Sequence, residues 1–130
     1  MALRISSELH RQLLAMAAAS PDAEVCGLLF GGDHVERIVP VANVAANPQR
    51  NFEIDPDALF TAIRNERSGG VRLLGYYHSH PIGPPMPSPR DTDQAASDGR
   101  IWLIIGQGRV TAWRMNKTSQ FNEIEIQISA

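Results

Sequence analysis

The chain lacks several features that would assign it to other classes of protein. Cysteine occurs once, as Cys26, so no internal disulfide is possible, which suits a reducing, cytoplasmic compartment. No stretch reaches the ~20 apolar residues that a membrane span needs. Lysine and arginine are scattered and the formal net charge is −2, so no basic run indicates nucleic acid binding. Internal repeats and low-complexity segments are absent as well.

What remains is the composition of an ordinary globular protein. The 130 residues are 43% hydrophobic and 20% charged, and a chain of this length buries roughly two-thirds of its unfolded surface. We therefore expect one domain over residues 1–130. Near the start, Ile5, Leu9 and Leu13 recur at helical spacing, which predicts an amphipathic helix capped by Ser6 or Ser7.

The pattern along the rest of the chain predicts an α/β domain with a mixed sheet flanked by helices. Asp55-Pro56 and Ser88-Pro89 have the form of helix starts, a capping side chain followed by proline at the first helical position. The helix that begins at Pro56 is expected to end at Ser68-Gly69-Gly70. Apolar runs bounded by turn residues predict strands over residues 24–32, 34–41, 71–77, 101–106, 109–115 and 124–128.

The most informative segment follows the strand predicted over residues 71–77, where the chain reads His78-Ser79-His80-Pro81. Side chains two apart on a strand share a face, so His78 and His80 are expected to project together while Ser79 points away. Two neutral imidazoles on one face can hold a zinc ion at roughly 2.0–2.1 Å. Such a pair can equally consist of surface or satisfied core side chains.

A proline-rich loop links this pair to Ser88 and Asp91. Four prolines among residues 81–87 fix φ and remove backbone donors, so the loop is expected to be stiff and to turn the chain back. A helix opening at Ser88 could aim Asp91 at His78 and His80 as a third ligand. The same residues also resemble a capping box, in which Ser88 and Asp91 merely satisfy backbone amides. The combined spacing of all four residues favours a bound metal.

A general base for metal chemistry has to come from elsewhere, and Glu24 is the best candidate. It is the charged residue at the head of an apolar, strand-like run. An acid in that place is either the solvated end of the strand or a buried functional carboxylate, and the pattern leaves both open. Gly27 indicates close backbone approach or a bulge. Cys26 is interpreted as a small core residue.

These residues together resemble the JAMM, or MPN-plus, metalloprotease family. The resemblance covers nearly the whole chain, and the His-x-His-Pro motif, Ser88 and Asp91 fit the family's spacing without a gap or substitution. It implies a three-layer α-β-α sandwich related to cytidine deaminases. It also implies zinc, one ion per chain, bound by His78, His80 and Asp91, with Glu24 as acid/base and Ser88 assisting at the oxyanion. Deaminase chemistry is disfavoured, because a chain with a single cysteine cannot contain the Pro-Cys-x-x-Cys motif.

The resemblance also implies a substrate class. Family members hydrolyse peptide or isopeptide bonds at the C-terminal tail of ubiquitin or ubiquitin-like proteins, and short members resemble bacterial enzymes that trim ubiquitin-like sulfur carrier proteins. We expect such a carrier as the partner, with its tail added as a strand beside an exposed sheet edge. Residues 43–54 and the proline loop are the candidates for the walls of the groove. Two alternatives stay open: a zinc hydrolase of small amides or short peptides, and a non-catalytic interaction module. The sequence does not indicate the oligomeric state.

Overall fold

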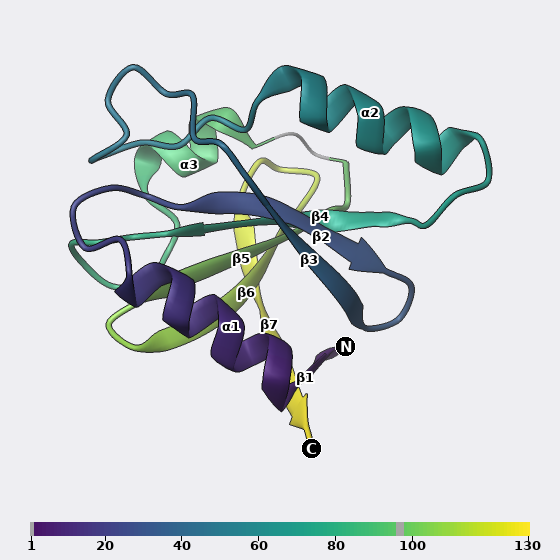
Figure 1. Cartoon of the computed structure of the whole chain (residues 1–130), viewed down its shortest axis with the longest axis horizontal. Helices are drawn as coiled ribbons and strands as arrows, with labels where there is room; N and C mark the ends of the chain where they lie inside the picture. Colours follow the sequence, from purple (N-terminus) through teal and green to yellow (C-terminus); the bar gives the residue numbers. More distant parts are fainter. Residues whose placement is uncertain (1, 96–97) are drawn as a thin grey trace.

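The computed structural model describes residues 2–95 and 98–130. Its strands are β1 (Ala2–Ser6), β2 (Cys26–Gly31), β3 (Val35–Val41), β4 (Leu73–Ser79), β5 (Ile101–Gly106), β6 (Arg109–Met115) and β7 (Phe121–Ser129). They form one mixed sheet in the order β1-β7-β6-β5-β4-β2-β3 (Figure 1). The pairs β1–β7 and β4–β5 are parallel and the other neighbours are antiparallel.

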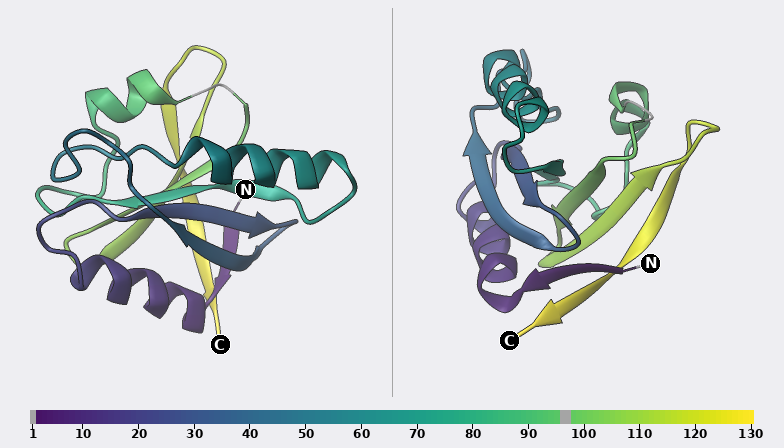
Figure 2. Two further views of the ribbon diagram at one scale, coloured as in Figure 1. Left: turned by 45° about the horizontal axis from the view of Figure 1, so that its top comes forward. Right: turned by 90° about the vertical axis from the view of Figure 1, so that its right-hand side faces the viewer.

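Helices cover both faces of this sheet, which gives the three layers expected. Helix α1 (Ser7–Ala18) packs on one face, and α2 (Pro56–Arg67) and α3 (Pro89–Gln94) lie over the other (Figure 2). The alternation along β2 shows how the sequence supports this arrangement. Leu29 belongs to the core beneath α1, whereas Leu28 and Phe30 pack with Ala62 of α2.

The N-terminus differs from the prediction. Ile5 was expected in the first helix, but it is buried in β1, a strand that runs parallel to β7. The helix begins one position after Ser6, whose Oγ accepts a hydrogen bond from the Leu9 N–H at 3.1 Å. The expectation of a Ser6 cap is confirmed, and the placement of Ile5 is wrong. Two apolar residues, Leu3 and Ile5, are too short a pattern to indicate a strand without the partner strand β7.

The remaining elements match the sequence pattern with shifted ends. The predicted strands at 24–32 and 34–41 correspond to the antiparallel pair β2 and β3, but β2 begins at Cys26, so Glu24 precedes the strand. Strand β4 extends to Ser79 and therefore includes His78. No helix in the described ranges is long and apolar enough to cross a membrane.

Strand β4 lies between β2 and β5, and this position places its end in the middle of the sheet. His78 pairs in register with Cys26 on one side and Ile104 on the other. Gly27 permits the close packing here, because a Cβ on it would lie 2.2 Å from the Tyr77 ring. Cys26 is buried, and burial raises the pKa of its thiol to about 12, so the interpretation as a core residue is confirmed.

Candidate metal centre

The two histidines of the motif come together at the C-terminal end of β4. His78 is fully buried within the strand, and His80 directly follows the last strand residue. Their Nε2 atoms lie 3.2 Å apart, as expected for side chains on one face. Ser79 faces the other way, and its Oγ accepts a hydrogen bond from the Val25 N–H at 2.9 Å. This bond also fixes the end of β4 to the residue after Glu24.

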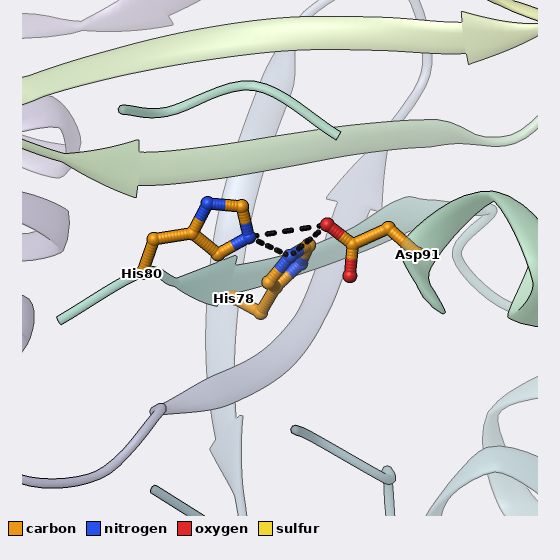
Figure 3. A group of neighbouring side chains, drawn as sticks. All are labelled: His78, His80 and Asp91. Carbon is orange, nitrogen blue, oxygen red and sulfur yellow. Dashed lines mark hydrogen bonds and ion pairs between the residues drawn. The ribbon is translucent and has the colours of Figure 1, made fainter. Parts of the chain in front are cut away.

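The first turn of α3 brings Asp91 to the histidine pair. Asp91 Oδ2 lies 3.2 Å from His78 Nε2 and 3.1 Å from His80 Nε2 (Figure 3). The same oxygen accepts a hydrogen bond from the Ser88 N–H at 2.9 Å, and Ser88 Oγ accepts one from the Asp91 N–H at 3.0 Å. The capping box and the approach to the histidines are therefore two functions of one carboxylate.

The candidate ligand atoms fit a metal ion. His78 Nε2, His80 Nε2 and Asp91 Oδ2 are separated pairwise by 3.1–3.2 Å. A tetrahedral zinc ion with bonds of roughly 2.0–2.1 Å needs ligand atoms about 3.3 Å apart. Two imidazoles and one carboxylate are also a donor set of catalytic zinc sites, in which the fourth position stays open. Distances and donor types agree with zinc.

The electrostatics of the three side chains suit the binding of a cation. Burial lowers the pKa of His78 against the opposing effect of Asp91, so this imidazole is neutral. Burial acts to raise the pKa of Asp91, but hydrogen bonds from His78 and His80 hold it well below its usual range. Burial acts to lower the pKa of His80, but the hydrogen bonds to Asp91 and Pro84 outweigh it and raise this pKa. A metal ion would displace a proton from His80 rather than from His78.

Groups around the histidines fix their orientation, and the sequence pattern did not identify them. The Phe52 ring stacks on His78 with centroids 4.2 Å apart and planes inclined by 15°, and Trp102 meets His78 edge-on at 5.5 Å. His80 Nδ1 donates a hydrogen bond to the Pro84 carbonyl at 2.9 Å. This bond sets the tautomer that leaves Nε2 free to bind a metal. An aromatic residue, Phe52, in a short segment outside the predicted strands was the one sequence feature that could have indicated such a contact.

Strand β6 supports the proline loop through a hydrogen bond from Thr111. Thr111 Oγ1 donates a hydrogen bond to the Pro85 carbonyl at 2.5 Å and accepts one from Trp113 Nε1 at 2.8 Å. Pro85 itself is fully buried. A chain of contacts therefore leads from β6 through the loop to the Pro84 carbonyl and His80. Sequence spacing could not indicate it, because Thr111 lies 26 positions from Pro85.

Glu24 is a buried carboxylate beside this centre, not the solvated end of a strand. The residue is 7% exposed, and its Oε1 has no hydrogen-bond partner among the described residues. Burial raises the pKa of Glu24 from 4.5 to about 7. The charge of His80 lowers this pKa and that of Asp91 raises it, so Glu24 lies within electrostatic reach of the metal centre.

Two clefts border the centre, and the C-terminal part of α1 contributes to both. One, of about 390 Å³, has His80 and Pro81 in its wall, together with residues of α1 and of the β5–β6 turn. The other, of about 380 Å³, has Glu24 and Asn43 in its wall. Each of the two segments expected to form groove walls, the proline loop and residues 43–54, thus contributes to a cleft beside a candidate site residue.

The chain belongs to the Prok-JAB family, the prokaryotic homologues of the JAB domain, whose sequence profile matches residues 6–116. This confirms the resemblance drawn from the motif. The chain is 36% identical over 116 residues to the desampylase of Haloferax volcanii, covering 86% of this chain and 83% of that protein. It is 44% identical over 91 residues to a probable TtuB-protein conjugate cleaving protease of Thermus thermophilus, covering 69% of this chain and 60% of that protein.

A solved structure confirms the fold class. It is described as JAMM, a metalloprotease-like zinc site in the proteasome and signalosome, and it superposes with a TM-score of 0.60. The match covers 98% of this chain and 99% of that chain at 18% identity. The α/β sandwich with a mixed sheet is therefore the JAMM/MPN fold.

Proposed function

We propose that the protein is a zinc-dependent peptidase that hydrolyses peptide or isopeptide bonds at the C-terminal tail of a small ubiquitin-like or sulfur carrier protein. The observation that carries the proposal is the convergence of His78, His80 and Asp91 within 3.2 Å of one another beside the buried Glu24. The names of the two relatives, a desampylase and a conjugate cleaving protease, support the substrate class. The zinc site described for the JAMM structure supports the choice of metal.

The three ligands would hold zinc with one coordination position open to solvent or substrate. Zinc bound there would lower the pKa of a water molecule and polarise the scissile carbonyl. Ser88 supplies a hydrogen-bond donor for the developing oxyanion. Its Oγ accepts from the Asp91 N–H, which leaves the hydroxyl proton free to be donated.

Glu24 moves the proton. It accepts the proton of the attacking water while the new C–O bond forms, and it passes this proton to the leaving amine as the C–N bond breaks. In the metal-free protein burial raises the pKa of Glu24 to about 7, which moves this carboxyl toward the ambient pH at which a catalytic acid/base works best. Its buried position also keeps the carboxylate from being fully solvated.

The test begins with the metal content of the purified protein beside His80→Ala prepared identically. About one zinc per chain in the wild type, lost in the variant, is the expected result. A panel of tail-extended ubiquitin-like carriers is then incubated with wild type, with wild type plus chelator, and with Glu24→Gln. Cleavage by zinc-loaded wild type alone supports the proposal. Cleavage of short peptides but of no carrier would instead indicate a small-amide hydrolase, and no metal in either protein would indicate a binding module.

A further inference from the structure

The segment between β3 and α2 contains no regular helix or strand, yet it is bonded to the site at several points. The Glu24 N–H donates to the Pro48 carbonyl at 2.7 Å, and within the segment the Val44 N–H donates to the Glu53 carbonyl at 2.9 Å. On the opposite side, Gln94 Nε2 of α3 donates to the Phe52 carbonyl at 3.2 Å. The segment therefore bridges the residue proposed as acid/base and the helix that carries Asp91.

Asn43 is the centre of this bonding. Its Nδ2 donates to the carbonyls of Glu24 and Asn51, each at 2.9 Å. Its Oδ1 accepts from the N–H groups of Ala45 at 3.1 Å and Glu53 at 3.0 Å. Two donors meet two carbonyls and one acceptor meets two amides, so the full hydrogen-bonding capacity of the side chain is used in one orientation only.

The consequence for Glu24 is that its main chain is held at both ends of the residue. The N–H is bonded to Pro48 and the carbonyl to Asn43, whereas the side-chain Oε1 has no partner in the described part of the chain. The position of the carboxylate is thus determined by the backbone and by burial. Losing the Asn43 bond would release the carbonyl of Glu24 and, with it, the direction in which the side chain leaves the main chain.

The side chain of Asn43 also acts on the metal centre, through Phe52. Asn43 binds the carbonyl of Asn51 and the N–H of Glu53, the residues on either side of Phe52. The Phe52 ring lies flat on His78, with centroids 4.2 Å apart. One asparagine therefore fixes both the acid/base candidate and the ring that covers a candidate metal ligand.

We propose that Asn43 is a positioning residue for catalysis, which aligns Glu24 with the metal centre through its carbonyl and seats Phe52 on His78. The proposal rests on the function proposed above. It assigns to residues 43–54 a role in assembling the site in addition to the role of groove wall expected from the sequence.

The first experiment measures turnover of Asn43→Ala on a ubiquitin-like carrier with a fluorogenic C-terminal amide, normalised to bound zinc. We expect kcat to fall about 10- to 100-fold with KM changed less than about threefold, because misplacing a catalytic group lowers transition-state stabilisation without weakening substrate binding. Zinc stoichiometry should stay at the wild-type level. Asn43→Asp keeps both acceptor contacts and loses both donors, and it should lose kcat as Asn43→Ala does.

The matched control is Asn116→Ala. Asn116 organises the β6–β7 turn by the same chemistry, accepting hydrogen bonds from Thr118 and Gln120. Asn43→Ala and Asn116→Ala should both lower the melting temperature, but only the variants at Asn43 should lower kcat. Equal kcat in Asn43→Ala and wild type would overturn the proposal. A rise in KM at unchanged kcat would overturn it too, because that result indicates a residue that only contacts substrate in the groove wall.

A second measurement does not depend on activity. In the metal-free protein, amide hydrogen exchange at Glu24, Ala45 and Glu53 should accelerate at least about tenfold in Asn43→Ala, while exchange in β5 stays at the wild-type rate relative to global stability. Unchanged exchange at Glu24 would refute the positioning role. If wild type cleaves no carrier but exchange responds as expected, the proposed function fails and the structural part of the inference stands.

Discussion

Ser88 and Asp91 bind each other twice, and the second of these bonds uses the oxygen that faces the histidines. Ser88 Oγ accepts from the Asp91 N–H, while Asp91 Oδ2 accepts from the Ser88 N–H and lies 3.1–3.2 Å from both imidazoles. A helix cap thus sets the carboxylate in place before any metal arrives. Such preorganisation reduces the conformational entropy that a ligand must lose on binding.

This relationship predicts two separable effects for Ser88→Ala. The lost N-cap should reduce the free energy of unfolding by about 1 kcal/mol, measured in the metal-free protein. The lost hydroxyl donor should reduce kcat by about 10²–10³, measured with zinc bound. Ser88→Thr keeps both the cap and the donor, and it should resemble wild type in both assays. A Ser88→Ala enzyme with wild-type kcat would remove Ser88 from the oxyanion role.

Glu24→Gln should nearly abolish turnover while zinc remains bound. The amide occupies the same volume but cannot accept and return a proton, so the loss lies in kcat rather than in the metal site. Parallel measurements of zinc content and cleavage rate check this. Residual cleavage at the wild-type rate would assign proton transfer to another group.

The pKa of Glu24 makes a second prediction, on stability rather than activity. Below pH 4.5 the carboxyl is protonated in both the folded and the unfolded chain; between pH 4.5 and about 7 only the unfolded chain loses the proton. Wild-type stability should therefore fall as pH rises through this window. Relative to Glu24→Gln, the metal-free wild type should lose on the order of 1–3 kcal/mol across this window. Denaturant unfolding of both proteins over the same range tests it, and a constant difference would contradict the raised pKa.

The sequence allowed the cluster of two histidines and an aspartate to be predicted because strand geometry and helix capping are local rules. His78 and His80 share a face by their spacing, and Ser88-Pro89 marks a helix start that aims Asp91. The environment of Glu24 was not predictable in the same way, because its main chain is hydrogen-bonded to Asn43 and Pro48, which only the folded chain brings next to it. The contacts of Phe52 and Thr111 could not be predicted for a related reason, since they join segments that only the folded sheet brings together.

Zinc affinity should fall as the pH decreases, because the binding of each zinc ion releases one proton. His80 has a raised pKa and must be deprotonated to bind, whereas His78 is already neutral and Asp91 already ionised. The dissociation constant should weaken about tenfold per pH unit below the pKa of His80. Titration of the Glu24→Gln protein isolates this proton, because the carboxyl of Glu24 cannot contribute. A slope of two protons would mean that His78 is protonated as well.

Thr111→Val tests the support that β6 gives to the proline loop. Valine keeps the shape but removes the donor to the Pro85 carbonyl and the acceptor for Trp113 Nε1, so two polar groups lose their partner. Stability should fall by about 1–3 kcal/mol. The neighbouring Pro84 carbonyl fixes the His80 tautomer, and altered contacts around metal ligands typically cost about 10–100-fold in affinity. We expect a smaller loss of zinc affinity, about three- to tenfold, because Thr111 acts one step further from the ligand.

The control for this prediction is Thr118→Val, which removes a hydroxyl that donates to Asn116 in the β6–β7 turn. It can lower stability but should leave zinc affinity at the wild-type value. Competition with a chromophoric chelator at constant pH measures both variants. If the two variants bind zinc equally, the hydrogen bond from Thr111 does not help the loop to hold His80.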